Sequence, residues 1–544
     1  MAGFTQLPDS VIVGVAKYVQ SVRNKNTSSA WGPLLALLSI CRSWRKAILP
    51  VVYSKAFIEC YSEANSCDTQ TGKSYRGCDT DDYTKIKWIT NIDLLLATNN
   101  WCFAKELNIK LEPETLRLRP FISKVSEILD LQNTWDNISS LNMSLYPGFM
   151  HSHKLDVTQA FSEANLENAV ERLTRCLPNI CAILVKGNDK DRSSVFGGKV
   201  VSHYADKLAR LQCYESMKLT VSSFSPQLTR LAVDGPALLS GQFPAVDLEM
   251  LESLRLDNLP FYFSWNCFAR SEAHDQMVFP KLKSLTIQIG ENYSNTGYMP
   301  FSRKESSIGA SFPALERLSI VHGSKNCPIL DKCAFPNNLS EIRIYCKCNS
   351  DLIQNYLTKM TVSKLFIALD SDGCRFSKKL YKTYCSLINR IKVTNGITMS
   401  LGKDVKIKSP FWTYKWKGVT KAIFDDSTYL IILGRLVVFP DIQAIEINYL
   451  NIQTNSNSYI DGLCVSDKIV ENRLNTKLKA ISLTFDLEEC PVENAVVFVK
   501  YLMLNIESLI CVKVPEALVP YIDDYVVGEM WQNPRLLHIQ ITST

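Results

Sequence analysis

The sequence predicts an α/β fold in which parallel strands, backed by helices, stack into one solenoid. Three observations predict it. A short apolar phrase recurs along most of the chain, an apolar residue followed by proline often precedes it, and stretches with helical periodicity lie between several copies. The last two members of each phrase lie two residues apart, so on a strand they point to the same face. Strands that alternate with helices favour a parallel sheet backed by those helices.

The phrase is an apolar residue, a gap of two, an aliphatic residue, a gap of one and another aliphatic residue. Clear copies are Leu228-Leu231-Val233, Leu251-Leu254-Leu256, Leu282-Leu285-Ile287, Leu315-Leu318-Ile320, Leu339-Ile342-Ile344, Val362-Leu365-Ile367, Ile442-Ile445-Ile447, Leu478-Ile481-Leu483, Ile506-Leu509-Cys511 and Leu536-Ile539-Ile541. Weaker copies are Leu107-x-Ile109, Leu141-x-Met143 and Ile180-Ile183-Val185, with two degenerate ones expected near Ile397-x-Met399 and Ala422-x-Phe424.

The spacing of the copies indicates the type of solenoid. Steps run from 23 residues, between Leu231 and Leu254, to 48 residues, between Ile183 and Leu231. The shorter steps match leucine-rich repeats, and the longer ones leave room for extra helix or loop. We therefore expect an irregular leucine-rich-repeat horseshoe over residues 101–544, whose members share a core that no single member could form.

The segments between the phrases predict helices, strand entries and loops. Apolar residues at helical spacing predict helices over 157–173 and 492–503. Proline suits the position just before a central strand, and the phenylalanines that precede it should pack beneath the sheet as a spine. The pairs are Leu177-Pro178, Phe279-Pro280, Phe312-Pro313, Phe335-Pro336 and Phe439-Pro440. Stretches rich in Gly, Ser, Asn and Asp predict loops over Asn65–Asp82, Lys186–Lys199 and Gly290–Ser311.

Composition limits the class of protein. Of the 544 residues, 46% are apolar and 21% are charged, an ordinary globular balance. We find no run of about 18 uncharged apolar residues, the length that a membrane-spanning helix needs, and no secretory signal at the N-terminus. The 18 cysteines include no CxxC pair, which favours reduced thiols. We expect a cytoplasmic or nuclear protein with no membrane partner.

The net charge of +6 is concentrated in the first sixty residues. Residues 1–60 contain seven cations and two acids, which gives +5 and leaves +1 for the other 484 residues. A solenoid that binds nucleic acid should carry a basic face along its length, so we expect no nucleic-acid partner. The positive end favours an acidic protein partner, although simple solvated helix faces explain it equally well.

The first sixty residues predict two or three short helices followed by a strand. Pro8 and Asp9 suit the first turn of a helix. An apolar stripe follows at three- and four-residue spacing: Val11, Ile12, Val15, Tyr18 and Val19. A second apolar block runs from Trp31 to Ile40, and Pro50 is expected to end that segment. Such a short segment encloses too small an interior to be very stable alone.

An F-box is the family that this segment resembles, through Leu7-Pro8, the aliphatic blocks, Cys41-Arg42-x-Trp44-Arg45, Pro50 and Tyr53. The resemblance implies a helical module over residues 1–60 that docks on the Skp-type adaptor of SCF-type cullin–RING ubiquitin ligases. It implies a contact edge formed by Leu7, Pro8, Val11 and Ile12, and a surface completed or supported by Leu35, Leu38, Cys41 and Trp44. F-box proteins commonly carry leucine-rich repeats, and these irregular repeats resemble those of large fungal F-box families. Residues 61–100 would form a linker and a first irregular segment.

Residues between the two buried members of a phrase should lie on the open face of the sheet. Arg and Tyr are favoured interface anchors. We expect a target protein to contact Arg255, Arg343, Tyr345, Phe366 and Glu446, on a surface that also includes Asp257, Thr286, Gln288, Ser319 and Asn448. The mixture carries no dominant charge, which favours a protein partner over nucleic acid. For any single position, a solvated strand face is the commoner explanation.

The sequence contains no recognisable catalytic or metal-binding motif. Gly72-Lys73-Ser74 imitates the end of a phosphate-binding loop, but Cys67 stands where that motif needs glycine. Neither His151-x-His153 nor Cys346-x-Cys348 has further ligands nearby, and Phe196-Gly197-Gly198-Lys199 is interpreted as a glycine turn. We expect no catalytic residues, no metal and no cofactor.

These features predict the substrate-recognition subunit of an SCF-type ubiquitin ligase, which binds a Skp-type adaptor and a target protein and is not itself an enzyme. Two alternatives stay open. In the first, the chain is an interaction scaffold whose N-terminal helices only cap the solenoid. In the second, it is an enzyme with a site in residues 366–444.

Overall fold

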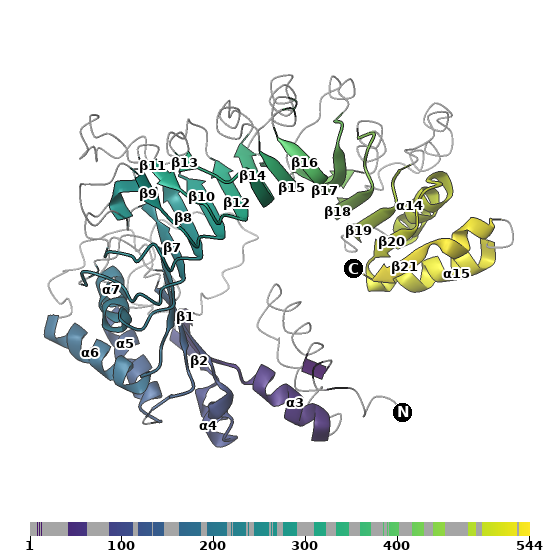
Figure 1. The fold of residues 1–544 in the computed structure, drawn as a ribbon. Helices are drawn as coiled ribbons and strands as arrows, with labels where there is room; N and C mark the ends of the chain where they lie inside the picture. Colours follow the sequence, from purple (N-terminus) through teal and green to yellow (C-terminus); the bar gives the residue numbers. More distant parts are fainter. Residues whose placement is uncertain are drawn as a thin grey trace, which may run out of the picture. The chain divides into compact units, whose positions relative to one another are not determined.

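A computed structural model shows a mixed α/β chain with a large, mostly parallel sheet and few helices (Figure 1). The chain divides into two compact units. Unit 1 comprises Met1–Leu256 and Asn266–His274, and unit 2 comprises Asp257–Trp265 and Asp275–Thr544. The structure describes residues 8, 10, 12, 13, 42–62, 86–111, 118–132, 134–145, 163–186, 193–214, 219, 221–235, 238, 244–259, 263, 265–268, 276–290, 309–322, 333–347, 360–370, 385, 389, 391–401, 416–428, 439–451, 477–485, 492–529 and 533–543.

The start of the chain is helical where it is described. Ser10, Ile12 and Val13 have helical backbone. The Ile12 N–H donates to the Pro8 carbonyl at 3.2 Å, which is the hydrogen bond of one α-helical turn. This agrees with a helix that begins at Pro8.

Helix α3 (Arg42–Val52) contains the second part of the F-box-like motif and buries one side, formed by Trp44, Ile48, Val51 and Val52. The expectation that Pro50 ends this segment is wrong, because the helix continues through it. The last turn closes without the missing proline N–H, since the Tyr53 N–H donates to the Leu49 carbonyl at 3.0 Å.

Unit 1 is built on a sheet whose strands lie in chain order, except that β2 lies outside β1. The strands are β1 (Lys55–Ser62), β2 (Ile86–Thr90), β3 (Glu106–Leu111), β4 (Ser140–Leu145), β5 (Ala182–Lys186), β6 (Arg210–Tyr214) and β7 (Arg230–Asp234). β2 is antiparallel to β1, and each later pair, from β1–β3 to β6–β7, is parallel. β8 (Ser253–Leu259) begins in unit 1 and ends in unit 2.

The predicted phrases form the buried face of the unit 1 sheet, together with one copy, Leu211-x-Cys213, that the sequence analysis did not assign. One row of register partners is Leu107, Leu141, Ile183, Leu211 and Leu231, and the next is Ile109, Met143, Val185, Cys213 and Val233. All ten side chains are at most 3% exposed, which confirms the weaker copies of the phrase. Asp257, which was expected on the open face, is buried, because the alternation in β8 breaks at Asn258, where φ is +50°.

A hydrogen-bond arrangement that we call the carbonyl clamp joins many strands to the next. The Lys105 carbonyl accepts from both the Ser139 N–H and the Ser140 N–H, at 3.0 and 3.1 Å, where β4 begins. The same double acceptance occurs at Ser54, Ser139, Cys181, Ala209 and Thr229 in unit 1, and at Lys283, Glu316, Gln443 and Lys479 in unit 2. The clamp uses main-chain atoms only.

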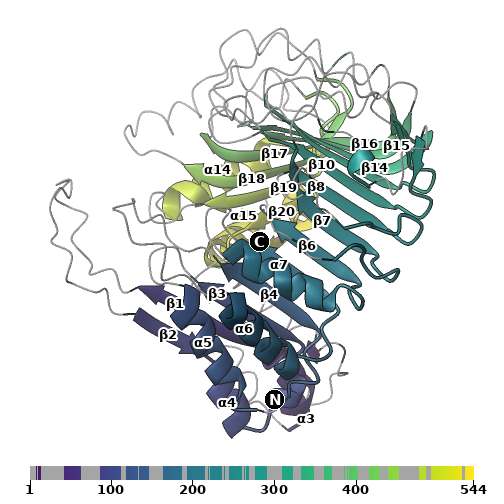
Figure 2. The same cartoon turned by 90° about the vertical axis from the view of Figure 1, so that its left-hand side faces the viewer.

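Three helices, α5 (Leu118–Leu129), α6 (Glu163–Cys176) and α7 (Ser193–Tyr204), lie side by side against the unit 1 sheet (Figure 2). Two shorter elements, α4 (Ile92–Ala97) and the 3₁₀ helix η2 (Trp101–Phe103), precede them. α6 confirms the helix expected over 157–173, and the part of that range before residue 163 lies outside the described residues.

The expected loop over Lys186–Lys199 is wrong from Ser193 onward, where α7 begins, and so is the expected glycine turn within it. Gly197 and Gly198 are buried inside this helix. A glycine costs a helix about 1 kcal/mol relative to alanine, but burial of several large apolar side chains outweighs that cost. The α7 side chains buried in unit 1 are Phe196, Val200, Val201 and Tyr204.

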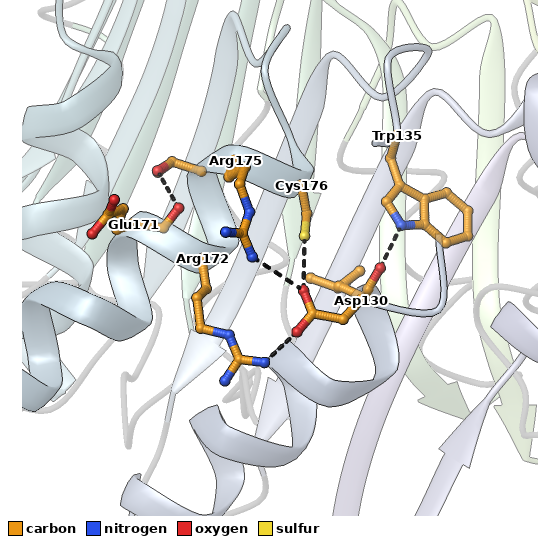
Figure 3. A network of polar contacts seen from close by, with 8 residues as sticks. Asp130, Trp135, Glu171, Arg172, Arg175 and Cys176 are labelled. Atoms are coloured by element: carbon orange, nitrogen blue, oxygen red, sulfur yellow. Dashed lines mark hydrogen bonds and ion pairs between the residues drawn. The ribbon is translucent and has the colours of Figure 1, made fainter. Parts of the chain in front are cut away.

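A polar network joins the C-terminal ends of α5 and α6 (Figure 3). The Asp130 carboxylate accepts a hydrogen bond from the Arg172 guanidinium, lies 3.8 Å from that of Arg175, and accepts from the Cys176 thiol at 3.4 Å. Burial, followed by the hydrogen bond to the carboxylate, raises the pKa of Cys176 to about 11, so the thiol keeps its proton and is the donor. Beside the network, the Trp135 indole N–H donates to the last carbonyl of α5 at 3.2 Å.

The network should make the stability of unit 1 depend on pH. Partial burial alone would raise the pKa of Asp130, but the hydrogen bonds from Arg172 and Cys176 and the two guanidinium charges together lower it. In the unfolded chain the pKa of an aspartate is about 3.9. The network's contribution to the free energy of unfolding is therefore fully present above that pH, and it is lost as the pH falls through the lower pKa of the folded chain. We expect Asp130→Asn to destabilise by about 1 kcal/mol at pH 7, measured by urea unfolding, and by less at pH 3. An equal loss at both values would contradict the assignment.

Unit 2 contains a longer run of parallel strands. They are β10 (Ser284–Ile289), β12 (Arg317–His322), β14 (Asn338–Lys347), β15 (Thr361–Asp370), β16 (Lys392–Leu401), β17 (Val419–Thr428), β18 (Ala444–Asn451), β19 (Ala480–Phe485), β20 (Cys511–Val514) and β21 (Gln540–Ser543), each paired with the next. Three short strands form a second parallel sheet, in the order β9 (Gln276–Val278), β11 (Gly309–Ser311) and β13 (Cys333–Ala334). β11 corrects the end of the loop expected over Gly290–Ser311.

The two degenerate copies of the phrase are confirmed as β16 and β17. Ile397 and Met399 are buried in β16, and Ala422 and Phe424 are buried in β17. The register shifts between these two strands, so Ala422 lies beside Met399 and not beside Ile397.

One copy was assigned to the wrong face. Leu509 and Cys511 were expected to be the buried pair of their strand, but Val512 and Val514 have that role. Leu509 lies in the turn before β20, where its N–H donates to the Ile506 carbonyl at 3.2 Å. A slip of one residue moves every side chain of a strand to the other face, so Cys511 is only half-buried.

The phenylalanine spine is confirmed in unit 2. The rings of Phe279 and Phe312 stack with centroids 5.1 Å apart, and those of Phe312 and Phe335 stack at 5.6 Å. The Trp265 ring meets Phe279 and Phe312 edge-on, at 5.7 and 5.4 Å. Phe439 is also fully buried, against Trp416 and Phe424.

Within the described residues of unit 2, the helices whose bounds are established lie near the end of the chain, and Cys385 and Asn389 also have helical backbone. α14 (Val492–Asn505) confirms the helix expected over 492–503, and η8 (Glu516–Leu518), α15 (Val519–Glu529) and η9 (Pro534–His538) follow. The short η4 (Trp265–Phe268) stands where the sequence passes between the units. Among the helices of the described ranges, each is too short or too polar to cross a bilayer.

Candidate functional site

The open face of the unit 2 sheet carries an arginine held by acidic and aromatic neighbours. Glu341, Arg343 and Tyr345 alternate with the buried Ile342 and Ile344 along β14, so the three point to the open face. Phe366 on β15 is the register partner of Arg343. We call these four side chains, Glu341, Arg343, Tyr345 and Phe366, the Arg343 cluster.

The geometry of the cluster fixes the guanidinium. Arg343 Nε donates to Glu341 Oε1 at 2.9 Å, and the guanidinium carbon lies 5.9 Å from the centroid of the Phe366 ring, within cation–π range. The Tyr345 and Phe366 rings are 5.5 Å apart and inclined at 49°. The hydrogen bond to Glu341, with a smaller contribution from Tyr345, raises the pKa of Arg343 above its ordinary value. The Arg343 side chain is nevertheless 50% exposed, so the arrangement presents a fixed cation to solvent.

Two further cations flank the cluster. Glu341 has Arg317 of β12 and Lys364 of β15 as its register partners, and both are exposed. The Glu341 carboxylate is used by Arg343, and within the described residues neither Arg317 nor Lys364 forms an ion pair. Where side chains are described, the open face of β12, β14 and β15 therefore carries three cations and one acid.

The structure brings together three of the five residues expected to bind a target. Arg343, Tyr345 and Phe366 are in contact, whereas Glu446 lies on β18 and pairs with Lys421 of β17 at 2.8 Å. Arg255 is exposed on the unit 1 part of β8. Sequence analysis missed Glu341, Arg317 and Lys364. Glu341-x-Arg343 carries a signal that would have found the first, because residues two apart on a strand share a face.

Of the residues expected to bind the adaptor, three are described. Pro8 is exposed, whereas Ile12 is fully buried and Trp44 is 4% exposed. Leu7, Val11, Leu35, Leu38 and Cys41 lie outside the described residues. Of these three side chains only that of Pro8 is open to solvent, and a contact through Ile12 requires that side chain to become exposed.

The described ranges contain few candidate residues for metal binding or catalysis. There, no group of three or more His, Cys, Asp or Glu side chains is placed to hold a metal ion. Cys348, His151 and His153, whose spacing resembled that of metal ligands, lie outside those ranges, as does Gly72-Lys73-Ser74. No protein-family model matches the chain, and no curated protein matches it.

Proposed function

We propose that this chain is the substrate-recognition subunit of an SCF-type cullin–RING ubiquitin ligase in the cytoplasm or nucleus. Its F-box-like N-terminus binds a Skp-type adaptor, and its leucine-rich-repeat-like sheet holds a target protein for ubiquitin transfer by the other subunits. The Arg343 cluster is the observation that carries the target-binding half of the proposal. A fixed, half-exposed arginine beside two aromatic rings is typical of the residues that anchor a protein interface. The four side chains of the cluster lie on two neighbouring parallel strands, β14 and β15.

The adaptor-binding half is supported by the F-box resemblance, by the helical backbone at Ser10, Ile12 and Val13 and by the exposure of Pro8. Co-expression of the full chain with a Skp-type adaptor, followed by size-exclusion chromatography, tests it. We expect a stable complex, and we expect Leu7→Ala with Pro8→Ala to weaken it at least about tenfold, since truncation of two central anchors costs more than about 1.4 kcal/mol.

A matched control uses the same two residue types elsewhere. Pro534 and Leu537 are exposed in η9 of unit 2, so Pro534→Ala with Leu537→Ala should leave the complex unchanged. If the wild-type chain forms no complex with the adaptor, the ligase proposal fails.

One observation favours a second function, that of a scaffold whose N-terminal helices only cap the repeats. Ile12 and Trp44 are both buried in the chain by itself, as capping residues would be. Under this alternative no adaptor complex forms, and Trp44→Ala lowers the thermal stability of the chain.

A further inference from the structure

We propose that the open face around the Arg343 cluster binds an acidic, extended peptide segment that carries an apolar side chain between its carboxylates. The inference rests on the proposed function, because it names the class of target that this face would recognise. It is argued from the charge, the rigidity and the spacing of the side chains on β12, β14 and β15.

The charge on this part of the face is not compensated. Among the open-face side chains that the structure describes on these three strands, Arg317, Arg343 and Lys364 stand against one acid, Glu341, which leaves a surplus of two positive charges. Elsewhere on the same face, Lys421 and Glu446 neutralise each other. A local surplus of this kind attracts a partner of the opposite charge and fixes its register.

Arg343 is prepared to bind a carboxylate. Its Nε donates to Glu341 and its guanidinium carbon lies over the Phe366 ring, so the guanidinium is held before any ligand arrives. A guanidinium has five N–H donors, so donors remain for a carboxylate of the partner. Because the group is already ordered, binding costs less side-chain entropy than it would for a free arginine.

The aromatic pair gives the site its apolar part. Tyr345 and Phe366 are half-buried on the open face, with their ring centroids 5.5 Å apart. One aliphatic or aromatic side chain of a ligand can cover these rings while its neighbours reach the cations. Strands lie about 4.8 Å apart, so the distance from β12 to β15 is about 10 Å, the length of about three extended residues.

The same composition argues against a nucleic acid. Aromatic rings and cations also bind single strands, but such sites follow the phosphate backbone with a continuous positive groove. Here Glu341 lies between Arg317 and Lys364 in register, where it would repel a phosphate chain. A peptide with separated carboxylates avoids that acid.

Fluorescence anisotropy with the full chain tests the proposal. Three labelled peptides of equal length are compared: repeats of Glu-Glu-Leu, of Gln-Gln-Leu and of Lys-Lys-Leu. We expect the first to bind at least about tenfold more tightly than the second, the third not to bind, and the affinity for the first to fall with added salt.

Substitutions on this face test whether the acidic peptide binds there. Arg343→Gln, and Arg317→Gln with Lys364→Gln, should each weaken the acidic peptide about tenfold, whereas Lys513→Gln, the same change on the open face of β20, should not. Arg343→Lys, which keeps the charge and lacks the planar fork, should give an intermediate affinity. Circular dichroism establishes that each variant is folded.

Three results would overturn the inference: equal binding of the Gln peptide, an equal loss in Lys513→Gln, or a labelled single-stranded oligonucleotide that binds more tightly than the acidic peptide. Adaptor binding, measured on the same variants, separates the two proposals. A chain that binds the acidic peptide but no adaptor keeps this inference and loses the ligase function. A chain that binds the adaptor but discriminates no peptide keeps the function and loses the inference.

Discussion

Phe312→Ala is expected to lower the free energy of unfolding of unit 2 by about 3–5 kcal/mol. Phe312 has no exposed surface and stands between Phe279 and Phe335 in the stacked spine, with Trp265 against its edge. Alanine would remove the ring and leave a cavity, and it would also end the continuous stack. The cost therefore combines lost burial, lost aromatic contacts and incomplete relaxation of the neighbours.

Chemical denaturation measures the loss, and hydrogen-exchange mass spectrometry locates it in β10, β12 and β14. Tyr521→Ala is the matched control, because Tyr521 is an aromatic residue of the same unit that is 56% exposed on α15. Its replacement should change stability by no more than about 0.5 kcal/mol. A loss in Phe312→Ala no larger than in the control would show that the spine does not stabilise the unit.

Gly396→Ala is expected to destabilise unit 2 by about 2–4 kcal/mol, for two independent reasons. Gly396 has a φ of +127°, a backbone conformation that residues other than glycine rarely adopt. A Cβ placed there would also lie 2.3 Å from Thr420 Oγ1 and 3.3 Å from Thr420 Cβ. Thr420 stands where the register between β16 and β17 shifts, and its hydroxyl donates to the Ile397 carbonyl at 3.3 Å.

A double-mutant cycle separates the two reasons. With Thr420→Ala added, the steric part of the loss should disappear and the backbone strain should remain, so the double variant should be more stable than the sum of single losses predicts. Gly528→Ala, in α15, is the control: nothing lies within 4 Å of its Cβ, and alanine there should stabilise by about 0.5–1 kcal/mol. Urea unfolding of the five chains (the wild type, the two single variants, the double variant and the control) gives these values, and an unchanged midpoint for Gly396→Ala would refute both reasons.

Much of the fold could be predicted because the buried rows follow a strict period of two. Leu285 and Ile287 or Ile342 and Ile344 show their face from spacing alone. The prediction failed where burial in the folded chain outweighed the local sequence signal. Gly197 and Gly198 indicated a turn, yet they lie in a helix that is held by its buried apolar side.

The candidate site was only partly predictable for a different reason. Arg343, Tyr345 and Phe366 could be assigned to the open face, since each stands next to a buried member of a phrase. Which strand lies beside which, and in which register, depends on the pairing of Arg317, Glu341 and Lys364, and the sequence between these strands carries no pattern that reveals it. Nor does the spacing reveal that the Glu341 carboxylate accepts a hydrogen bond from Arg343 and not from its register partners, Arg317 and Lys364.

The carbonyl clamp separates the requirements for folding from those for recognition. Each clamp fixes where the following strand begins through peptide groups, which every residue except proline supplies in full. An exposed position such as Arg343, on a strand that begins at a clamp, can thus be exchanged without shifting the strand that carries it, and the stretches between strands can lengthen or shorten. A scaffold of this kind lets ligand preference be redesigned by surface substitution, with the backbone left as a fixed template.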